Sequence, residues 1–220
     1  MLLDLGRWDD AIAAADRFIA ESATNPHYQD SPVRVIRAMV SLSRGDLIGA
    51  DIDSGLSVES ARTAKDPQVL LPAMMTRLIV EGRLDNAAEA SRLQAEIFSV
   101  VETAGRSALR AVGGWWTADM AGLSAWYLDL VANEETPFGA AIRAVRDGDL
   151  ELAADRFATT GLHAEAAYAR LVAAERQVAE GRPEKAAMNL QLTLDFYREV
   201  QATWFIERAT ALSATVTPEG

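Results

Sequence analysis

Apolar residues recur along the chain at the spacing that one face of a helix requires. In the stretch 67–81 they stand at i, i+3, i+4 and i+7, as Leu71, Met74, Met75 and Leu78. We interpret this stripe as the buried face of a helix rather than as a methionine-lined ligand groove. Similar stretches follow one another from end to end and predict helices over about 8–22, 32–44, 47–63, 67–81, 84–100, 101–112, 115–132, 137–147, 150–160, 164–180, 183–199 and 201–214.

A six-residue motif separates many of these stretches. It consists of Gly, a charged residue, a large or rigid residue, two variable positions and Ala. Glycine suits the left-handed backbone that ends one helix, and the Ala in the next helix lets two helix backbones approach closely. The copies are Gly6–Ala11, Gly45–Ala50, Gly82–Ala87, the degenerate Gly113–Ala118, Gly148–Ala153 and Gly181–Ala186.

The starting glycines are separated by 39, 37, 31, 35 and 33 residues. A period near 34 residues predicts one helical hairpin per repeat, with the glycine in the turn inside each hairpin. A capping residue followed by proline, a typical helix start, marks turns between hairpins at Ser31–Pro32, Asp66–Pro67 and Thr136–Pro137. The sequence therefore predicts an all-α repeat array.

This pattern resembles the tetratricopeptide repeat, and Phe157 falls on the aromatic position of that family's second helix. The resemblance implies a right-handed α-solenoid of five to six antiparallel helix hairpins, in a single domain over 1–220 that ends in a capping helix over 201–214. Several first-helix residues of the family are replaced, so its peptide-clamping residues do not transfer. The family's Trp, Leu, Gly and Tyr become Arg170, Ala173, Ala174 and Gln177.

The two ends of the sequence differ from a complete array. Only five residues precede Gly6, so we expect the chain to be a fragment whose first hairpin is incomplete; the alternative is that Met1 is the true start of a shortened capping helix. The stretch 194–209 resembles the tail of helical-repeat regions in large bacterial signalling proteins. Those proteins join an NTPase module to the repeats, with a class III adenylate cyclase or a LuxR-type DNA-binding domain as output. Gln201 and Trp204 depart from the usual Gly and Arg of that tail.

Composition narrows the function. The net charge of -11 disfavours nucleic-acid binding, because phosphate contacts need Lys and Arg. The 220 residues contain no cysteine, no apolar run of the length that a membrane span needs and no signal peptide, so we expect a cytoplasmic protein without membrane or nucleic-acid partners.

No catalytic motif occurs in the sequence. A phosphate-binding loop and a nucleophile elbow are both missing, and His27 and His163 lie far apart without a metal-binding spacing. We therefore predict a chain that is not an enzyme and carries no cofactor and no metal.

Two regions are candidates for binding. The aromatic-rich stretch 115–132 presents Trp116 beside Asp119, which predicts a slot for a small cationic or aromatic ligand; the alternative is that the rings fill space beside small neighbours. The first helices of the repeats predict a concave face for an apolar helix or peptide, and a solvated or self-packed face is the alternative. The residues of that face are Met39, Thr76, Phe138, Ile142, Arg146 and Glu175.

We therefore expect a protein-interaction or ligand-sensing module of a bacterial signal-transduction or transcription regulator. Its partners would be a protein, a peptide, the other domains of its own parent chain or a small-molecule effector. The alternative is a freestanding scaffold whose terminal helix pairs with a second copy to form a homodimer.

Overall fold

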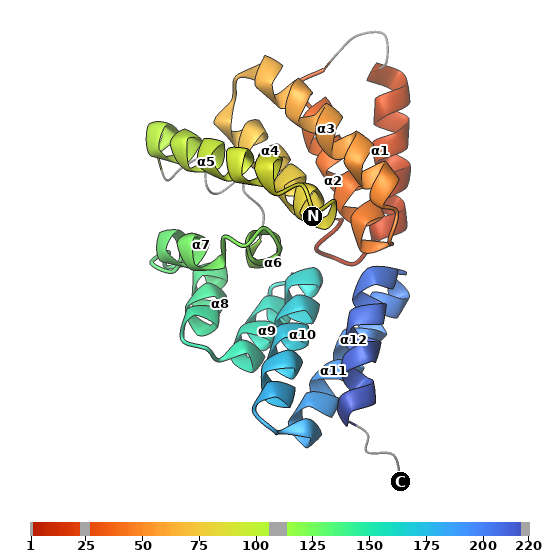
Figure 1. Cartoon of the computed structure of the whole chain (residues 1–220), viewed down its shortest axis with the longest axis vertical. Coiled ribbons are helices and arrows are strands. Elements are labelled where there is room, and N and C mark those ends of the chain that lie inside the picture. The colour runs from red at the N-terminus through yellow and green to blue at the C-terminus, as the bar shows by residue number, and fades with distance from the viewer. Residues whose placement is uncertain (1, 23–26, 106–113, 217–220) are drawn as a thin grey trace. The chain divides into compact units, whose positions relative to one another are not determined.

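The computed structural model describes residues 2–22, 27–105 and 114–216, all of which lie in helices or in the connections between them (Figure 1). These residues form two compact units. The N-terminal unit contains the described residues of 9–124, and the C-terminal unit contains 2–8 and 125–216. The all-α class is confirmed for the described residues, and the single domain over 1–220 stays a prediction.

The N-terminal unit is built from helices that pack against their neighbours in the sequence. Contacts join α2 to α3, α3 to α4 and α4 to α5, and α4 also contacts α6. The helices are α1 (Trp8–Ser22), whose first residue belongs to the C-terminal unit, α2 (Asp30–Ser43), α3 (Leu47–Ala64), α4 (Pro67–Arg83), α5 (Ala87–Ala104) and α6 (Trp115–Met120).

The C-terminal unit repeats this arrangement. Each helix from α8 to α12 contacts the next one along the chain. The helices are α7 (Ser124–Val131), whose first residue belongs to the N-terminal unit, α8 (Pro137–Arg146), α9 (Leu150–Thr159), α10 (His163–Ala179), α11 (Pro183–Glu199) and α12 (Thr203–Val216).

Residues 2–8 complete the C-terminal unit. The Asp4 carbonyl accepts a hydrogen bond from the His163 backbone N–H at 2.8 Å, and so satisfies a free donor at the start of α10. Trp8 is buried, and its ring meets the ring of Phe196 edge-on at a centroid distance of 6.2 Å. This segment forms a turn that packs against the unit, and the incomplete first hairpin stays a prediction.

One kind of turn connects most of the helices. At Gly45 the backbone is left-handed (φ 82°), the Gly45 N–H donates to the Leu42 carbonyl, and the next N–H, of Asp46, donates to the Ser41 carbonyl. This bonding satisfies two carbonyls at the end of α2, and the Asp46 carboxylate then caps α3. The same pair of backbone bonds follows Gly6, Gly122, Gly148, Gly161, Gly181 and Gln201.

The third copy of the motif is displaced from its predicted register. Gly82 lies inside α4, and the left-handed residue of this turn is Asp85 (φ 55°), followed by the capping residue Asn86. The residue four after the cap is therefore Ala90, whose N–H donates to the Asn86 carbonyl. Ala87, predicted to be the close-packed alanine, is exposed at the first position of α5.

In the other described copies the alanine register is confirmed. Four of these alanines are completely buried, and Ala11 is 4% exposed. An alanine at this position leaves no side chain beyond Cβ between the helices, so their backbones can lie close together. The four completely buried alanines are Ala50, Ala118, Ala153 and Ala186.

Two predicted helices have different bounds. The single helix over 115–132 is wrong, because α6 ends at Met120 and a left-handed turn at Gly122 (φ 72°) precedes α7. The apolar stripe continues across this turn, which is why spacing alone predicted one helix. Of the predicted helix 101–112, residues up to Ala104 belong to α5, and most of the rest, like Gly113 of the degenerate motif, lies outside the described residues.

Of the three helix starts predicted from a capping residue followed by proline, two are confirmed. Asp66 and Thr136 cap their helices through side-chain oxygens that accept from the N–H groups of Gln68 and Gly139, as predicted. The start at Ser31 is wrong, because α2 already begins at Asp30. The Ser31 hydroxyl is instead buried beside that of Ser57.

Candidate functional site

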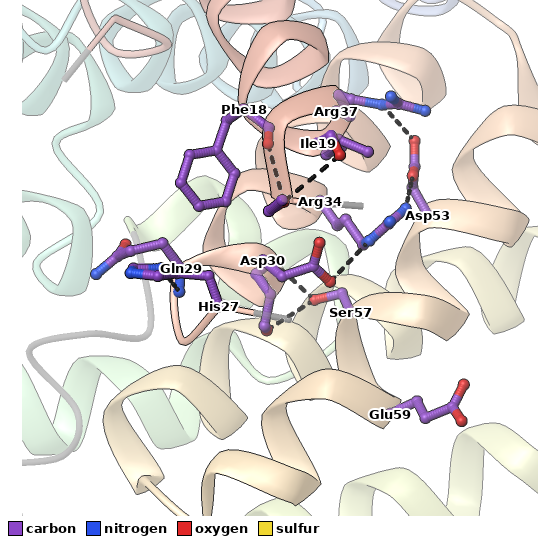
Figure 2. A network of polar contacts seen from close by, with 12 residues as sticks. Phe18, Ile19, His27, Gln29, Asp30, Arg34, Arg37, Asp53, Ser57 and Glu59 are labelled. Carbon is purple, nitrogen blue, oxygen red and sulfur yellow. Dashed lines mark hydrogen bonds and ion pairs between the residues drawn. The ribbon is translucent and has the colours of Figure 1, made fainter. Parts of the chain in front are cut away.

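A buried carboxylate organises the polar interior of the N-terminal unit. Asp53 on α3 is 2% exposed and accepts from two arginines of α2, from Arg34 Nη1 at 3.1 Å and from Arg37 Nε at 2.8 Å. Figure 2 shows both guanidinium groups reaching this one carboxylate. Because a buried charge needs charged or hydrogen-bonding partners, Asp53 ties α2 to α3.

Each of the two arginines also binds a second carboxylate. Arg34 Nε donates to Asp30 at 2.9 Å, one turn back on the same helix, and Arg37 Nη1 donates to Asp16 of α1 at 2.9 Å. Three carboxylates thus surround two guanidinium groups. Each guanidinium group is thus held by two carboxylates inside the protein.

A pocket of about 540 Å³ lies beside Arg34, and Tyr28 and Glu59 also line it. The Tyr28 hydroxyl donates to Asp66 at 2.8 Å, and this hydrogen bond raises the pKa of Tyr28 above its ordinary value. Glu59 lies apart from the ion-pair cluster (Figure 2). The lining of this pocket combines one arginine with two acids, Asp30 and Glu59.

A polar pair occupies the same register in the C-terminal unit. Arg34 lies eleven residues before Gly45 and Asp53 eight residues after it, and the residues at these distances from Gly181 are Arg170 and Asn189. Arg170 Nη1 lies 3.4 Å from Asn189 Oδ1. At the same distances from Asp85, the left-handed residue of the third copy, stand the apolar Met74 and Leu93, both completely buried.

Asn189 is fully buried and connects three helices. Its amide nitrogen donates to Glu151 of α9 at 3.0 Å and to Gln177 Oε1 of α10 at 3.0 Å. Arg170 can only donate and an ionised Glu151 can only accept, so the orientation of the Asn189 amide is fixed. Gln177 must then turn its oxygen towards Asn189.

A second pocket, of about 500 Å³, lies at the ends of α8 and α10, in the C-terminal unit. Its lining is polar and includes four carboxylates and two arginines. The charged and amide side chains of the lining are Asp147, Asp149, Glu151, Glu180, Arg176, Arg182 and Gln177.

The corresponding positions of the N-terminal unit are closed by ion pairs. Arg37 bridges to Asp16, and Arg44 Nη2 to Asp9 at 2.6 Å. Counted back from Gly45 and from Gly181, the positions of Arg37 and Arg44 are taken in the C-terminal unit by Ala173 and Glu180. Counted forward from Gly6 and from Gly148, the positions of Asp9 and Asp16 are taken by Glu151 and Ala158. Two acids and two alanines cannot form these bridges, so the pocket stays open.

The sequence-predicted site residues of the N-terminal unit are mostly interior. Met39 is 3% exposed, Thr76 is 1% exposed and Trp116 is 3% exposed. Asp119 is half-buried in α6. The three buried side chains pack within the unit, and the Trp116–Asp119 slot stays a prediction.

The predicted residues of α8 lie at different depths. Ile142 is completely buried. Phe138 is half-buried, and its ring centroid lies 5.9 Å from that of Phe157. Arg146 is exposed, with Nε 3.5 Å from the neighbouring Asp147 carboxylate.

Glu175 on α10 is already engaged within the C-terminal unit. Both of its carboxylate oxygens accept from Arg208 of α12, at 2.6 and 2.8 Å. The Arg208 guanidinium also lies 5.7 Å from the centre of the Tyr168 ring. This bidentate pair joins α10 to α12.

Sequence reasoning did not select the residues that organise the two polar interiors. A signal was present, because Arg170 and Gln177 stand where the tetratricopeptide pattern has large aromatic residues. Such a polar replacement at a buried position requires a polar partner. The partner Asn189 could be found only by aligning the repeats, in which Asn189 and Asp53 occupy equivalent positions.

Comparisons with protein-family models, with curated proteins and with solved structures found no match. None of the helices in the described part of the chain has the length and apolar character that crossing a bilayer requires. Among the residues that the structure describes, no group of three or more His, Asp or Glu residues could hold a metal ion.

Proposed function

We propose that this chain is a non-enzymatic regulatory or protein-interaction module, built as a right-handed α-solenoid of tetratricopeptide-like antiparallel hairpins. The observation that carries the proposal is contact between alternate helices, found for one pair of first helices in each unit. α2 contacts α4, and α10 contacts α12, in addition to the contacts between consecutive helices. In a stack of hairpins the first helices lie side by side in this way and line one extended surface.

The bacterial signalling context rests on the tail resemblance over 194–209. That tail usually has Gly where this chain has Gln201, and the Gln201 backbone is left-handed (φ 58°). Left-handed backbone is the conformation for which glycine is best suited. The local backbone thus supports the alignment at the position where the side chain departs from it.

The proposed mechanism is differential binding. A partner or effector that prefers one curvature of the array shifts its population, and the attached module responds to that shift. Such a mechanism needs no catalytic residue in the array. It needs only that the bound and free arrays differ in curvature.

The test uses the complete reading frame. If it encodes an NTPase module, deletion of residues 1–220 should change the rate of nucleotide hydrolysis severalfold, measured by phosphate release. An unchanged rate, or a reading frame without any further domain, contradicts the regulatory role.

The scaffold alternative, predicted to pair through the terminal helix, is favoured by an observation on a different helix, α3. Three large apolar residues on one face of this helix are exposed: Ile48 by 77%, Ile52 by 56% and Leu56 by 40%. A second copy of the chain could cover this stripe. Light scattering should then give a mass that rises with concentration, and Ile52→Glu should abolish the rise; a monomer at every concentration contradicts this alternative.

A further inference from the structure

The polar pocket at the ends of α8 and α10 contains hydrogen-bonding groups that the fold leaves unused. Gln177 is 4% exposed and lines the pocket, and its oxygen is committed to Asn189. Its amide NH₂ donates no hydrogen bond to any residue that the structure describes. Because Gln177 lines the pocket, an acceptor inside the pocket can bind this amide.

The neighbouring residue offers a second free donor. Arg176 lines the same pocket, and its guanidinium forms no ion pair or hydrogen bond within the described ranges. Arg182, by contrast, is paired with Glu180. Arg176 and Gln177 each offer donors to the pocket, and a carboxylate accepts from both kinds of donor.

Acceptors lie on the other side of the lining. Asp149 uses one carboxylate oxygen to cap α9 and Glu151 uses one to bind Asn189, so among the described residues the second oxygen of each carboxylate has no donor. Asp147 makes only the long, exposed contact with Arg146. These carboxylates favour a positively charged group.

The composition of the lining selects the class of ligand. Four carboxylates against two arginines disfavour a phosphate or another purely anionic molecule. A purely cationic molecule would leave the donors of Arg176 and Gln177 unsatisfied. A zwitterion with one carboxylate and one ammonium group satisfies both sets.

We infer that this pocket binds a small zwitterion of the amino-acid class, with its carboxylate on Arg176 and Gln177 and its ammonium group on the carboxylates of the α8–α9 turn. The volume of about 500 Å³ accommodates an amino acid or a dipeptide. The ion pairs that close the same register in the N-terminal unit explain why only one unit has the site. The inference goes beyond the proposed function and holds whether or not the array regulates a larger chain.

The test is calorimetric titration of the whole chain with L-alanine and with L-alanyl-L-alanine, whose two arms separate the free amino acid from the dipeptide. Binding of either one is expected, together with at least a tenfold loss of affinity when the ligand is acetylated at its amine or amidated at its carboxylate. No binding of either probe up to about 10 mM, or equal binding of inorganic phosphate, overturns the inference.

Two variants locate the site. Arg176→Gln changes an exposed side chain, and Gln177→Glu keeps the acceptor for Asn189 while it replaces the free donor. Both should weaken binding by about tenfold or more, because a hydrogen bond to a charged group is lost. Arg198→Gln, on an exposed arginine outside the pocket, is the matched control and should bind normally. Unaltered affinity in Arg176→Gln contradicts the inference even if Gln177→Glu fails to fold.

Discussion

The two units place a polar pair at the same register and put it to different use. In the N-terminal unit Arg34 meets the charged Asp53, a second arginine completes the cluster, and ion pairs close the surrounding space. In the C-terminal unit Arg170 meets the neutral Asn189, which has donors as well as an acceptor. The Asn189 amide donates to Gln177 and so fixes the orientation of that side chain, whereas a carboxylate such as that of Asp53 can only accept hydrogen bonds. One repeat position thus serves as a buried ion-pair centre in one unit and supports an open pocket in the other.

The largest expected effect of a substitution is at the charged pair. Asp53→Ala leaves two partly buried guanidinium groups without their shared acceptor and should lower the free energy of unfolding by about 3 kcal/mol or more. Urea denaturation measures it. Asn189→Ala removes uncharged hydrogen bonds and should cost less, about 1–2 kcal/mol. Asp9→Ala, at an exposed acid of the same unit, is the control and should change stability by no more than about 0.5 kcal/mol. Equal costs at Asp53 and Asn189 would remove the contrast between the units.

The alanine register can be tested in both units. Ala153→Leu should overpack the buried side of α9 and lower the free energy of unfolding by about 1–3 kcal/mol, whereas Ala158→Leu on the half-buried side should matter less. In the N-terminal unit Ala90 is half-buried, so Ala90→Leu should cost less than Ala153→Leu but more than Ala87→Leu, which should be nearly neutral, within about 0.5 kcal/mol. Thermal or urea denaturation of the four variants compares them. The reverse order at Ala87 and Ala90 would restore the register predicted from Gly82.

A smaller effect is expected at the left-handed turns. Gln201→Gly removes the steric cost of a left-handed side chain but makes the unfolded chain more flexible, so we expect a net gain of no more than about 1 kcal/mol. Gly181→Gln, at the equivalent position of the preceding turn, should lose about 1 kcal/mol. The difference between these reciprocal changes, measured by urea denaturation, isolates the backbone term. A loss of stability in Gln201→Gly would mean that the glutamine side chain stabilises its turn.

The smallest effect at neutral pH is expected for Tyr197→Phe. The Tyr197 hydroxyl is buried without a hydrogen-bond partner in the described structure, so its removal should leave stability unchanged or raise it by no more than about 1 kcal/mol. Burial raises the pKa of Tyr197 well above its ordinary value of 10.0. The folded state therefore keeps the proton when the unfolded state loses it, and stability should fall as the pH rises above 10.

The pH dependence should also differ between the units. Tyr197→Phe should reduce the loss of stability that occurs as the pH rises above 10. Burial also raises the pKa of Tyr127 in the same unit, so part of the loss should remain. In the N-terminal unit the pKa of Tyr28 is raised chiefly by the hydrogen bond to Asp66, and this side chain is 45% exposed, so Tyr28→Phe should change the alkaline profile less than Tyr197→Phe. Above pH 10, hydrogen exchange should show a greater loss of amide protection in the C-terminal unit of the parent protein than in that of Tyr197→Phe. An identical pH profile for both proteins contradicts the assignment.

Local patterns in the sequence predicted most helices because the residues that start and end a helix act locally. A glycine that ends a helix, as at Gly148, acts through its own backbone freedom and needs no distant contact. The pattern misplaced the third turn because Asp85 adopts the left-handed conformation without being glycine. It also merged α6 with α7, because the apolar residues keep the same helical spacing on both sides of the break.

The binding residues were much harder to predict. The concave-face prediction selected Met39, Thr76 and Ile142 by register, and all three side chains are buried. Register fixes the direction in which a side chain leaves its helix, but the packing of neighbouring helices decides whether that direction ends in solvent. The polar residues Gln177 and Asn189 acquire their roles only where α9, α10 and α11 meet.

The sequence by itself determined an all-α chain with recurrent turns and close-packed alanines. These properties depend on backbone conformation and periodicity, which act over a few residues. The tertiary structure decided that Asp53 collects two arginines, that residues 2–8 pack against the C-terminal unit, and that a pocket opens beside Gln177. Those outcomes depend on contacts between residues far apart in the sequence, where burial turns a polar side chain into one that must find a partner.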